Sequence, residues 1–177
     1  MEIRLLTPAD AKQYWELRLE ALKNDPSAFL SSYEEAVTRE NAIEQTARNF
    51  TAEGNYTFGA FDHDELIGVV TLLQEDRVKI GHRANIFAMY VTQSKRGLGI
   101  GKELMTAAIN KAKDIDVIEQ INLNVTARNQ RAKQLYTKLG FQEFGLEKHA
   151  LKVDGIYYDD FYMVLHLNKD RELNSND

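Results

Sequence analysis

Residues 89–104 read Met-Tyr-Val-Thr-Gln-Ser-Lys-Arg-Gly-Leu-Gly-Ile-Gly-Lys-Glu-Leu, so three closely spaced glycines follow an apolar run. Residues 84–91 have the length and composition of a buried strand, and Ile100, Leu104, Ala107 and Ala108 recur at helical spacing after the glycines. At a strand–loop–helix junction, the unpaired N–H groups of the first helical turn and the positive end of the helix dipole point at the loop. The run therefore predicts an anion-binding loop inside an α/β fold.

Two common phosphate-binding motifs do not fit this loop. A P-loop needs Ser or Thr after its Gly-Lys pair and a glycine five residues before its second glycine, but Glu103 follows Lys102 and Arg96 occupies the earlier position. A dinucleotide fingerprint that starts at Gly97 needs glycine where Lys102 stands. The loop also lies mid-chain, after strands that do not alternate with helices as in a dinucleotide-binding unit.

The segments before the loop indicate a mixed sheet. Residues 2–6 read as a strand, and Thr7 and Pro8 begin a helix that ends near Pro26. We expect its core stripe at Ala11, Trp15, Leu19 and Leu22. A loop at 28–37, a polar helix at 39–50 and a hairpin of strands at 56–61 and 66–74 follow.

The segments after the loop complete the fold. We expect a strand at 118–125, a helix stopped by Gly140, and an antiparallel pair at 141–150 and 156–167. The apolar stripe of that helix is Ala132, Leu135, Tyr136 and Leu139. The element order β-α-α-β-β-β-α-β-α-β-β predicts an α/β fold with a mixed sheet and no regular βαβ alternation.

Length and composition favour one intracellular domain. A chain of 177 residues with 44% hydrophobic and 28% charged residues suits a single core, which we place at 1–168, with a polar tail at 169–177. The absence of cysteine excludes a disulfide framework, a cysteine nucleophile and a thiolate zinc site. We find neither a signal-peptide pattern nor an apolar run of roughly 18 residues, so we expect a cytoplasmic protein without membrane association.

The net charge of −5 is unevenly distributed. Residues 93–138 carry nine Lys or Arg and four acids, a net charge of +5, which leaves −10 for the rest of the chain. An acidic protein is a poor general nucleic-acid binder, so no nucleic-acid partner is expected. The basic third favours a small polyanionic ligand, although solvated helix faces would produce the same count.

A second stretch, residues 125–141, contains Asn-x-x-Ala at Asn129 and Tyr-x-x-x-Gly-Phe at Tyr136. Together, the two stretches resemble motifs A and B of the GNAT family of N-acetyltransferases. In that family, Arg96, Gly99 and Gly101 would fill the positions that hold the CoA pyrophosphate. The resemblance, with the element order, covers roughly residues 1–167, and Gln93 departs from it where many members have proline.

The resemblance implies a mixed, mostly antiparallel central sheet flanked by helices, with its fourth and fifth strands splayed. Acetyl-CoA would be the co-substrate, and no metal is expected. The implied cofactor-binding residues are Met89, Tyr90, Val91, Arg96, Gly97, Leu98, Gly99, Ile100, Gly101, Lys102 and Asn129. The alternatives are a plain core strand at Met89–Val91 and a helix N-cap at Asn129. Arg128, Arg131 and Lys133 would face either the nucleotide phosphates or solvent.

The resemblance also implies that Tyr136 is the general acid. An amine that attacks the thioester expels CoA as a thiolate, and a phenol with a pKa near 10 can protonate that sulfur. The alternative is a tyrosine of the helical core stripe. We assign no general base, because Glu34, Glu35, Asp159, Asp160 and His149 are all candidates and each could be only a surface charge.

The acceptor amine is less well defined than acetyl-CoA. Residues 25–35 and 155–160 fall where the family builds its acceptor site, and we expect Tyr33, Glu34, Glu35 and Asp160 to bind the substrate. Acids gathered there would favour a cationic acceptor. The expected partners are a small amine or peptide acceptor and, as an open alternative, a second copy in a homodimer. A catalytically silent acyl-CoA-binding regulator and a protein modifier acting on N-termini or lysines stay open as alternative functions.

Overall fold

The computed structural model describes residues 1–167 and shows one seven-stranded sheet in the order β1-β2-β3-β4-β5-β7-β6. The strands are β1 (Glu2–Leu5), β2 (Asn55–Asp62), β3 (Glu65–Gln74), β4 (Arg83–Val91), β5 (Gln120–Thr126), β6 (Gln142–Val153) and β7 (Ile156–His166). The helices are α1 (Ala11–Asn24), α2 (Tyr33–Val37), α3 (Ala42–Phe50), α4 (Ile100–Lys113) and α5 (Gln130–Lys138). The predicted α/β class and mixed sheet are confirmed.

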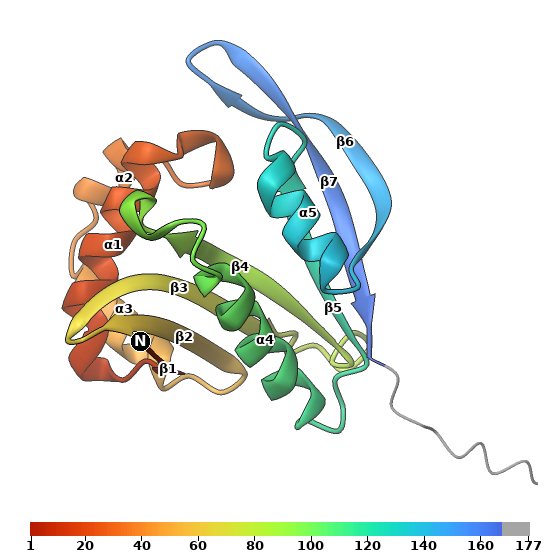
Figure 1. Ribbon diagram of the computed structural model, residues 1–177, viewed down its shortest axis with the longest axis horizontal. Coiled ribbons are helices and arrows are strands. Elements are labelled where there is room, and N and C mark those ends of the chain that lie inside the picture. Colours follow the sequence, from red (N-terminus) through yellow and green to blue (C-terminus); the bar gives the residue numbers. More distant parts are fainter. Residues whose placement is uncertain (168–177) are drawn as a thin grey trace, which may run out of the picture.

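The sheet opens at its one parallel pair. β4 and β5 are paired only at their starts, where Arg83, Ala84 and Asn85 lie opposite residues 120–122. Beyond these pairs the two strands diverge, and Figure 1 shows α4 beside β4 and α5 beside β5. The predicted splay of the fourth and fifth strands is therefore confirmed, and it leaves the edge of β4 that faces β5 unpaired from residue 86 onward.

Two hydrophobic clusters cover the two faces of the first half of the sheet. The larger cluster joins α4, through residues such as Leu104 and Ala108, to Ile67, Leu72 and Ile86 of the strands. The smaller cluster joins Leu17 and Ala21 of α1 to Leu66, Val69 and Tyr90. The sheet is thus a middle layer whose faces are sealed by α4 and by α1.

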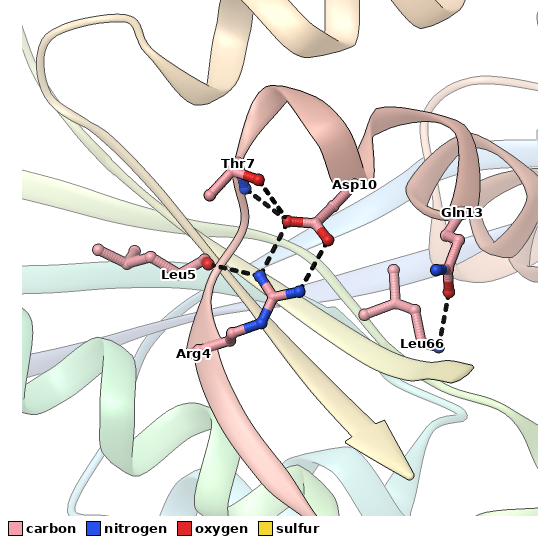
Figure 2. Close-up of polar contacts among 6 residues, drawn as sticks. All are labelled: Arg4, Leu5, Thr7, Asp10, Gln13 and Leu66. Atoms are coloured by element: carbon pink, nitrogen blue, oxygen red, sulfur yellow. Dashed lines mark hydrogen bonds and ion pairs between the residues drawn. The ribbon is translucent and has the colours of Figure 1, made fainter. Parts of the chain in front are cut away.

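The chain enters α1 through a polar network drawn in Figure 2. The carboxylate of Asp10 accepts two hydrogen bonds of 2.8 Å from Arg4 and two more, at 2.7 and 2.9 Å, from the backbone N–H and hydroxyl of Thr7. Gln13 then accepts the backbone N–H of Leu66 at 3.0 Å. Thr7 does begin the helical segment, as predicted, but its hydroxyl donates to Asp10 and caps no backbone N–H.

Two local predictions were wrong, one of them in part. The expected loop at 28–37 contains α2, because Ser32 and Glu35 form a capping box in which each side chain bonds the other residue's backbone N–H. The expected core stripe of α1 was half right: Ala11 and Leu22 are buried, but Trp15 and Leu19 are only half-buried, and Leu17 and Ala21 take their place in the core.

The domain limit at residue 168 stays a prediction, and the tail at 169–177 lies outside the described residues. Over residues 1–167, no helix combines the length and apolar character needed to span a bilayer.

Candidate functional site

A cleft of about 840 Å³ lies between the diverging strands. Its walls come from α1, the segment 25–31, β4, the glycine loop, α5 and the inner side of β7. Ligand pockets usually span roughly 300–1,000 Å³, so this cleft is large enough for two reactants that meet inside it.

The glycine loop forms one end of the cleft. Gly97 and Gly99 have φ values of 90° and 85°, a left-handed region that residues with a side chain rarely adopt. Gly99 is the N-cap of α4, and its carbonyl accepts the N–H groups of Lys102 and Glu103. Among residues 1–167, no acceptor is bonded to the N–H groups of residues 97–101. These N–H groups at a helix start form a site for an anion.

Gly101 permits close approach to the loop from inside the cleft. A Cβ on Gly101 would lie 3.1 Å from the Cε of Met89 and 3.4 Å from a methyl carbon of Leu135. All three residues line the cleft. A branched side chain at this position would therefore fill space that a ligand lying between β4 and α5 needs.

A β-bulge shapes the β4 wall. Val69 of β3 lies opposite Tyr90 and Thr71 lies opposite Phe87, so Val70 faces both Ala88 and Met89. Ala88 accordingly takes a left-handed φ of 52°. The extra residue re-aims the side chains that follow it, next to the unpaired edge of the strand.

Arg96 braces the loop through contacts within the protein. Its Nε donates to the carbonyl of Val91 at 2.9 Å, its guanidinium bonds Asp25 at 2.5 Å, and it lies 5.2 Å above the ring of Tyr90. The side chain predicted to hold phosphate is thus largely occupied by structural contacts, because the loop and the end of α1 must be held together.

Three other cations line the cleft near the loop, and one of them, Arg128, lies 4.8 Å above the ring of Tyr158. Lys102, Arg128 and Arg131 line the cleft, and a guanidinium nitrogen of Arg131 lies 3.5 Å from where a Cβ on Gly97 would be. Lys133 is not among the lining residues and pairs instead with Glu143 at 2.8 Å. Of the three cations suggested for the phosphates, Arg128 and Arg131 thus line the cleft and Lys133 does not.

Asn129 is a helix cap that also lines the cleft. Its side-chain oxygen accepts the N–H of Ala132 at 3.1 Å and so caps α5. The residue also lines the cleft, and its amide NH₂ group is still available to a ligand.

Tyr136 is a core residue and a cleft residue at once. It is 6% exposed, packs against Phe141 with ring centroids 6.0 Å apart, and lines the cleft. Burial raises the pKa of Tyr136 to about 12, because the phenolate would lose its hydration. The phenol is therefore protonated at neutral pH and can only donate a proton.

Asp160 is the buried carboxylate of the site. It is 4% exposed and lines the cleft from β7. One carboxylate oxygen accepts the side-chain amide of Asn124 at 2.8 Å, whereas the other is buried and has no partner among the described residues. An unsatisfied buried carboxylate oxygen is costly, so this position favours a cationic or hydrogen-bond-donating ligand group.

The other predicted acceptor residues do not reach the cleft. Tyr33, Glu34 and Glu35 lie on α2 and are absent from its lining, as is Leu98, whose side chain is 69% exposed. Glu35 caps Ser32, and Asp159 bonds the backbone N–H of His149 and pairs with Lys148. Of the residues expected to bind the acceptor, only Asp160 therefore lines the cleft.

Sequence reasoning missed the cations at the far end of the cleft. Arg18, from α1, and Arg39, just after α2, line the cleft together with Phe29. The available signal was the helical spacing of Ala11, Tyr14, Arg18 and Ala21, which places an arginine on the inner side of α1.

A buried carboxylate such as that of Asp160 can also be a metal ligand when other ligands lie beside it. Within residues 1–167, no cluster of three His, Cys, Asp or Glu residues could hold a metal ion.

The sequence matches the acetyltransferase (GNAT) family over residues 17–141, so the chain belongs to that family. It is 32% identical over 112 residues to the ribosomal protein uS5-alanine N-acetyltransferase of Escherichia coli, covering 62% of this chain and 57% of that protein. It is 36% identical over 87 residues to an N-alpha-acetyltransferase of Sulfurisphaera tokodaii, covering 49% and 48%. These alignments span only about half the length of the curated relatives.

Solved structures share the fold. A putative acetyltransferase of Salmonella typhimurium, determined with its cofactor acetyl-CoA, has a TM-score of 0.84 at 17% identity and covers 99% of both chains. A GNAT-family acetyltransferase of Streptococcus pneumoniae has a TM-score of 0.83 at 22% identity, with 94% of this chain and 99% of that chain covered.

Proposed function

We propose that the protein is an N-acetyltransferase that transfers the acetyl group of acetyl-CoA to a primary amine by direct attack in a ternary complex. One observation carries this proposal: the free N–H groups of the glycine loop, the unpaired edge of β4 and the phenol of Tyr136 all border one cleft. Family membership and the relatives named as N-acetyltransferases support it.

Each part of acetyl-CoA has a matching group in the chain. The pyrophosphate suits the N–H groups of residues 97–101, with Lys102, Arg128 and Arg131 as nearby cations. The amides of the pantetheine arm suit the open edge of β4, which could accept an added strand. A cofactor bound in this order would bring its thioester toward Tyr136, which lines the same cleft.

The reaction then consists of nucleophilic attack on the thioester, loss of the thiolate and the proton transfers that accompany these two steps. A neutral amine attacks the thioester carbonyl carbon and forms a C–N bond, which gives a tetrahedral intermediate with a positively charged nitrogen. Collapse breaks the C–S bond, and the departing thiolate takes the phenolic proton of Tyr136. The surplus proton on the new amide nitrogen returns to the phenolate, so Tyr136 is restored. Asp160, which lines the cleft, would hold the incoming ammonium, take its first proton and release that proton to solvent.

Calorimetry with acetyl-CoA, combined with a thiol-release assay over a panel of amines, tests this function. The key variant is Gly101→Val, whose side chain would occupy the path between Met89 and Leu135 and should abolish acetyl-CoA binding while the protein stays folded. Asn110→Ala, exposed at the other end of α4, is the matched control and should bind normally. Unchanged affinity in Gly101→Val would overturn the assignment of the site.

A peptide α-amino group is a second acceptor candidate beside a small amine. It is favoured by the similarity to an enzyme named for an alanine of ribosomal protein uS5 and to an N-alpha-acetyltransferase. Peptides with a free and with a blocked N-terminus, compared in the same thiol-release assay, test this candidate directly.

A further inference from the structure

Arg18 is a half-buried guanidinium without an acidic partner among the described residues. It lines the cleft from α1, and its guanidinium lies 4.6 Å above the ring of Phe29. Stacking on an aromatic face satisfies the face of a guanidinium and leaves the N–H groups at its edge available. Burial lowers the pKa of Arg18, which indicates a desolvated charge.

Two other half-buried arginines near the ends of α1 each have the carboxylate partner that Arg18 lacks. Arg4 binds Asp10 through two hydrogen bonds of 2.8 Å, and Arg96 binds Asp25. Among residues 1–167, only two carboxylates line the cleft: Asp25, which is engaged by Arg96, and Asp160, which bonds Asn124. A desolvated guanidinium without a carboxylate in residues 1–167 is a place where a ligand anion would be stabilised.

We infer that the acceptor carries an anionic group besides its amine, and that the guanidinium of Arg18 binds this anion. The inference rests on the proposed acetyltransferase function and specifies its substrate class. Asp160 and Arg18 supply opposite charges to one cleft, which suits a molecule that itself carries an ammonium and a carboxylate. Exposed Arg39 adds a second cation at the same mouth.

The aromatic residues that line the cleft with Arg18 indicate the chemistry of the rest of the acceptor. Tyr14, Trp15 and Phe87 line the same end of the cleft, and Phe87 is 46% exposed although it lies on a central strand. An apolar body would cover these rings. The acceptor class is thus an amine with a carboxylate and an apolar portion, either as a free amino acid or as a peptide end with an acidic side chain.

Matched acceptor pairs separate charge from amine reactivity. One arm compares L-methionine and L-phenylalanine with their C-terminal amides, and the other compares the peptide amides Ala-Glu-Phe and Ala-Gln-Phe. In wild type, the carboxylate member of a pair should have the higher kcat/KM. In Arg18→Gln, the ratio within that pair should shrink by about 10- to 100-fold, as expected for loss of a charge-assisted hydrogen bond.

Two further variants control this result. Arg18→Lys keeps the charge without the planar fork and should retain part of the preference. Arg48→Gln removes an exposed arginine on α3 that does not line the cleft, so it should leave the ratio unchanged. If the kcat/KM ratio changes only in the amino-acid arm, the carboxylate is that of a free amino acid. If it changes only in the peptide arm, the carboxylate is that of an acidic side chain.

The outcomes distinguish this inference from the function on which it rests. Equal or higher kcat/KM for the neutral members, or a carboxylate preference that survives in Arg18→Gln, overturns the inference and leaves the acetyltransferase intact. Failure of every amine, in these arms and in the wider panel, to release thiol from bound acetyl-CoA instead overturns the proposed function.

Discussion

Tyr136 lies in the hydrophobic core and also borders the cleft. A substitution can therefore remove its hydroxyl without removing the ring that packs in the core. Tyr136→Phe keeps the packing against Phe141 and removes only the transferable proton. We expect kcat to fall by about 10²-fold or more, the usual contribution of general acid catalysis, while acetyl-CoA affinity barely changes. Steady-state kinetics and calorimetry on the same preparation measure both. A variant with wild-type kcat would restrict Tyr136 to the core.

The pKa of Tyr136 also predicts the alkaline side of the pH–rate profile. Burial raises this pKa to about 12, so the phenol keeps its proton well above the ordinary tyrosine pKa of about 10. Because the acid must be protonated to act, ionisation of Tyr136 should cause no loss of kcat below about pH 11. A decline in kcat with an apparent pKa near 10 in wild type, absent from the residual activity of Tyr136→Phe, would contradict this prediction.

Asp160 and its neighbour offer a matched pair on β7. Asp160→Asn keeps the shape and removes the charge beside the cleft, so acceptor kcat/KM should fall by about 10-fold or more while acetyl-CoA affinity holds. Asp159→Asn removes an adjacent charge that pairs with Lys148 outside the cleft, and kinetics should barely respond. Equal effects from the two variants would assign Asp160 a general electrostatic role only.

At the scale of elements, the entry to α1 depends on one carboxylate. Four hydrogen bonds reach Asp10, and those from Arg4 are the main reason that its pKa lies well below the ordinary value. Asp10→Asn should therefore lower the free energy of unfolding by about 1–2 kcal/mol, a reduced figure because Arg4 is partly exposed. Denaturant unfolding at neutral pH measures this loss.

The depressed pKa of Asp10 also makes its contribution to the free energy of unfolding depend on pH. The unfolded chain takes up a proton near pH 4, whereas folded Asp10 resists protonation, so this contribution is complete above about pH 5 and declines as pH falls toward the folded pKa. The gap in stability between wild type and Asp10→Asn should narrow on acidification. Asp64→Asn, exposed in the β2–β3 turn, is the control and should show no such gap at neutral pH.

At the scale of the molecule, the sheet consists of two halves joined by a short parallel pairing. Acetyl-CoA that spans the cleft would touch both halves, so binding should stabilise the whole fold. At a ligand concentration 100 times Kd the gain is about 2.7 kcal/mol, which for a chain of this size raises Tm by roughly 5–10 °C. Thermal unfolding tests this shift, which Gly101→Val should lose.

Amide hydrogen exchange shows which strands acetyl-CoA stabilises. Amides at the open edge of β4, in residues 86–91, should exchange more slowly with acetyl-CoA present, whereas those of the β6–β7 hairpin tip should not respond. Protection confined to α4 and its loop would show that the nucleotide binds without the added-strand pairing.

Features that depend on local chemistry could be predicted from the sequence. Glycines with positive φ, a helix that starts directly after them, and the Asn129 cap each follow from neighbouring residues, so the position of the glycine loop and most elements were predicted correctly. The α2 capping box was equally local, yet it was overlooked in a segment read as a loop. In α1 the predicted Ala11 and Leu22 are buried, but Leu17 and Ala21 replace Trp15 and Leu19 in the core, because packing against the sheet selects the buried side.

The sequence by itself thus determined the family resemblance, the order of the elements apart from α2, the glycine loop before α4 and the place of Tyr136 on α5. Only the tertiary structure decided which charges meet in that cleft. Glu34 and Glu35 have the composition of an acceptor site, but capping and orientation keep them outside it. Arg18 and Asp160 lie at opposite ends of the chain and converge because α1 and β7 flank the opening between β4 and β5. Net charge along a sequence carries no information about such convergence, since burial, not composition, selects the charges that a substrate meets.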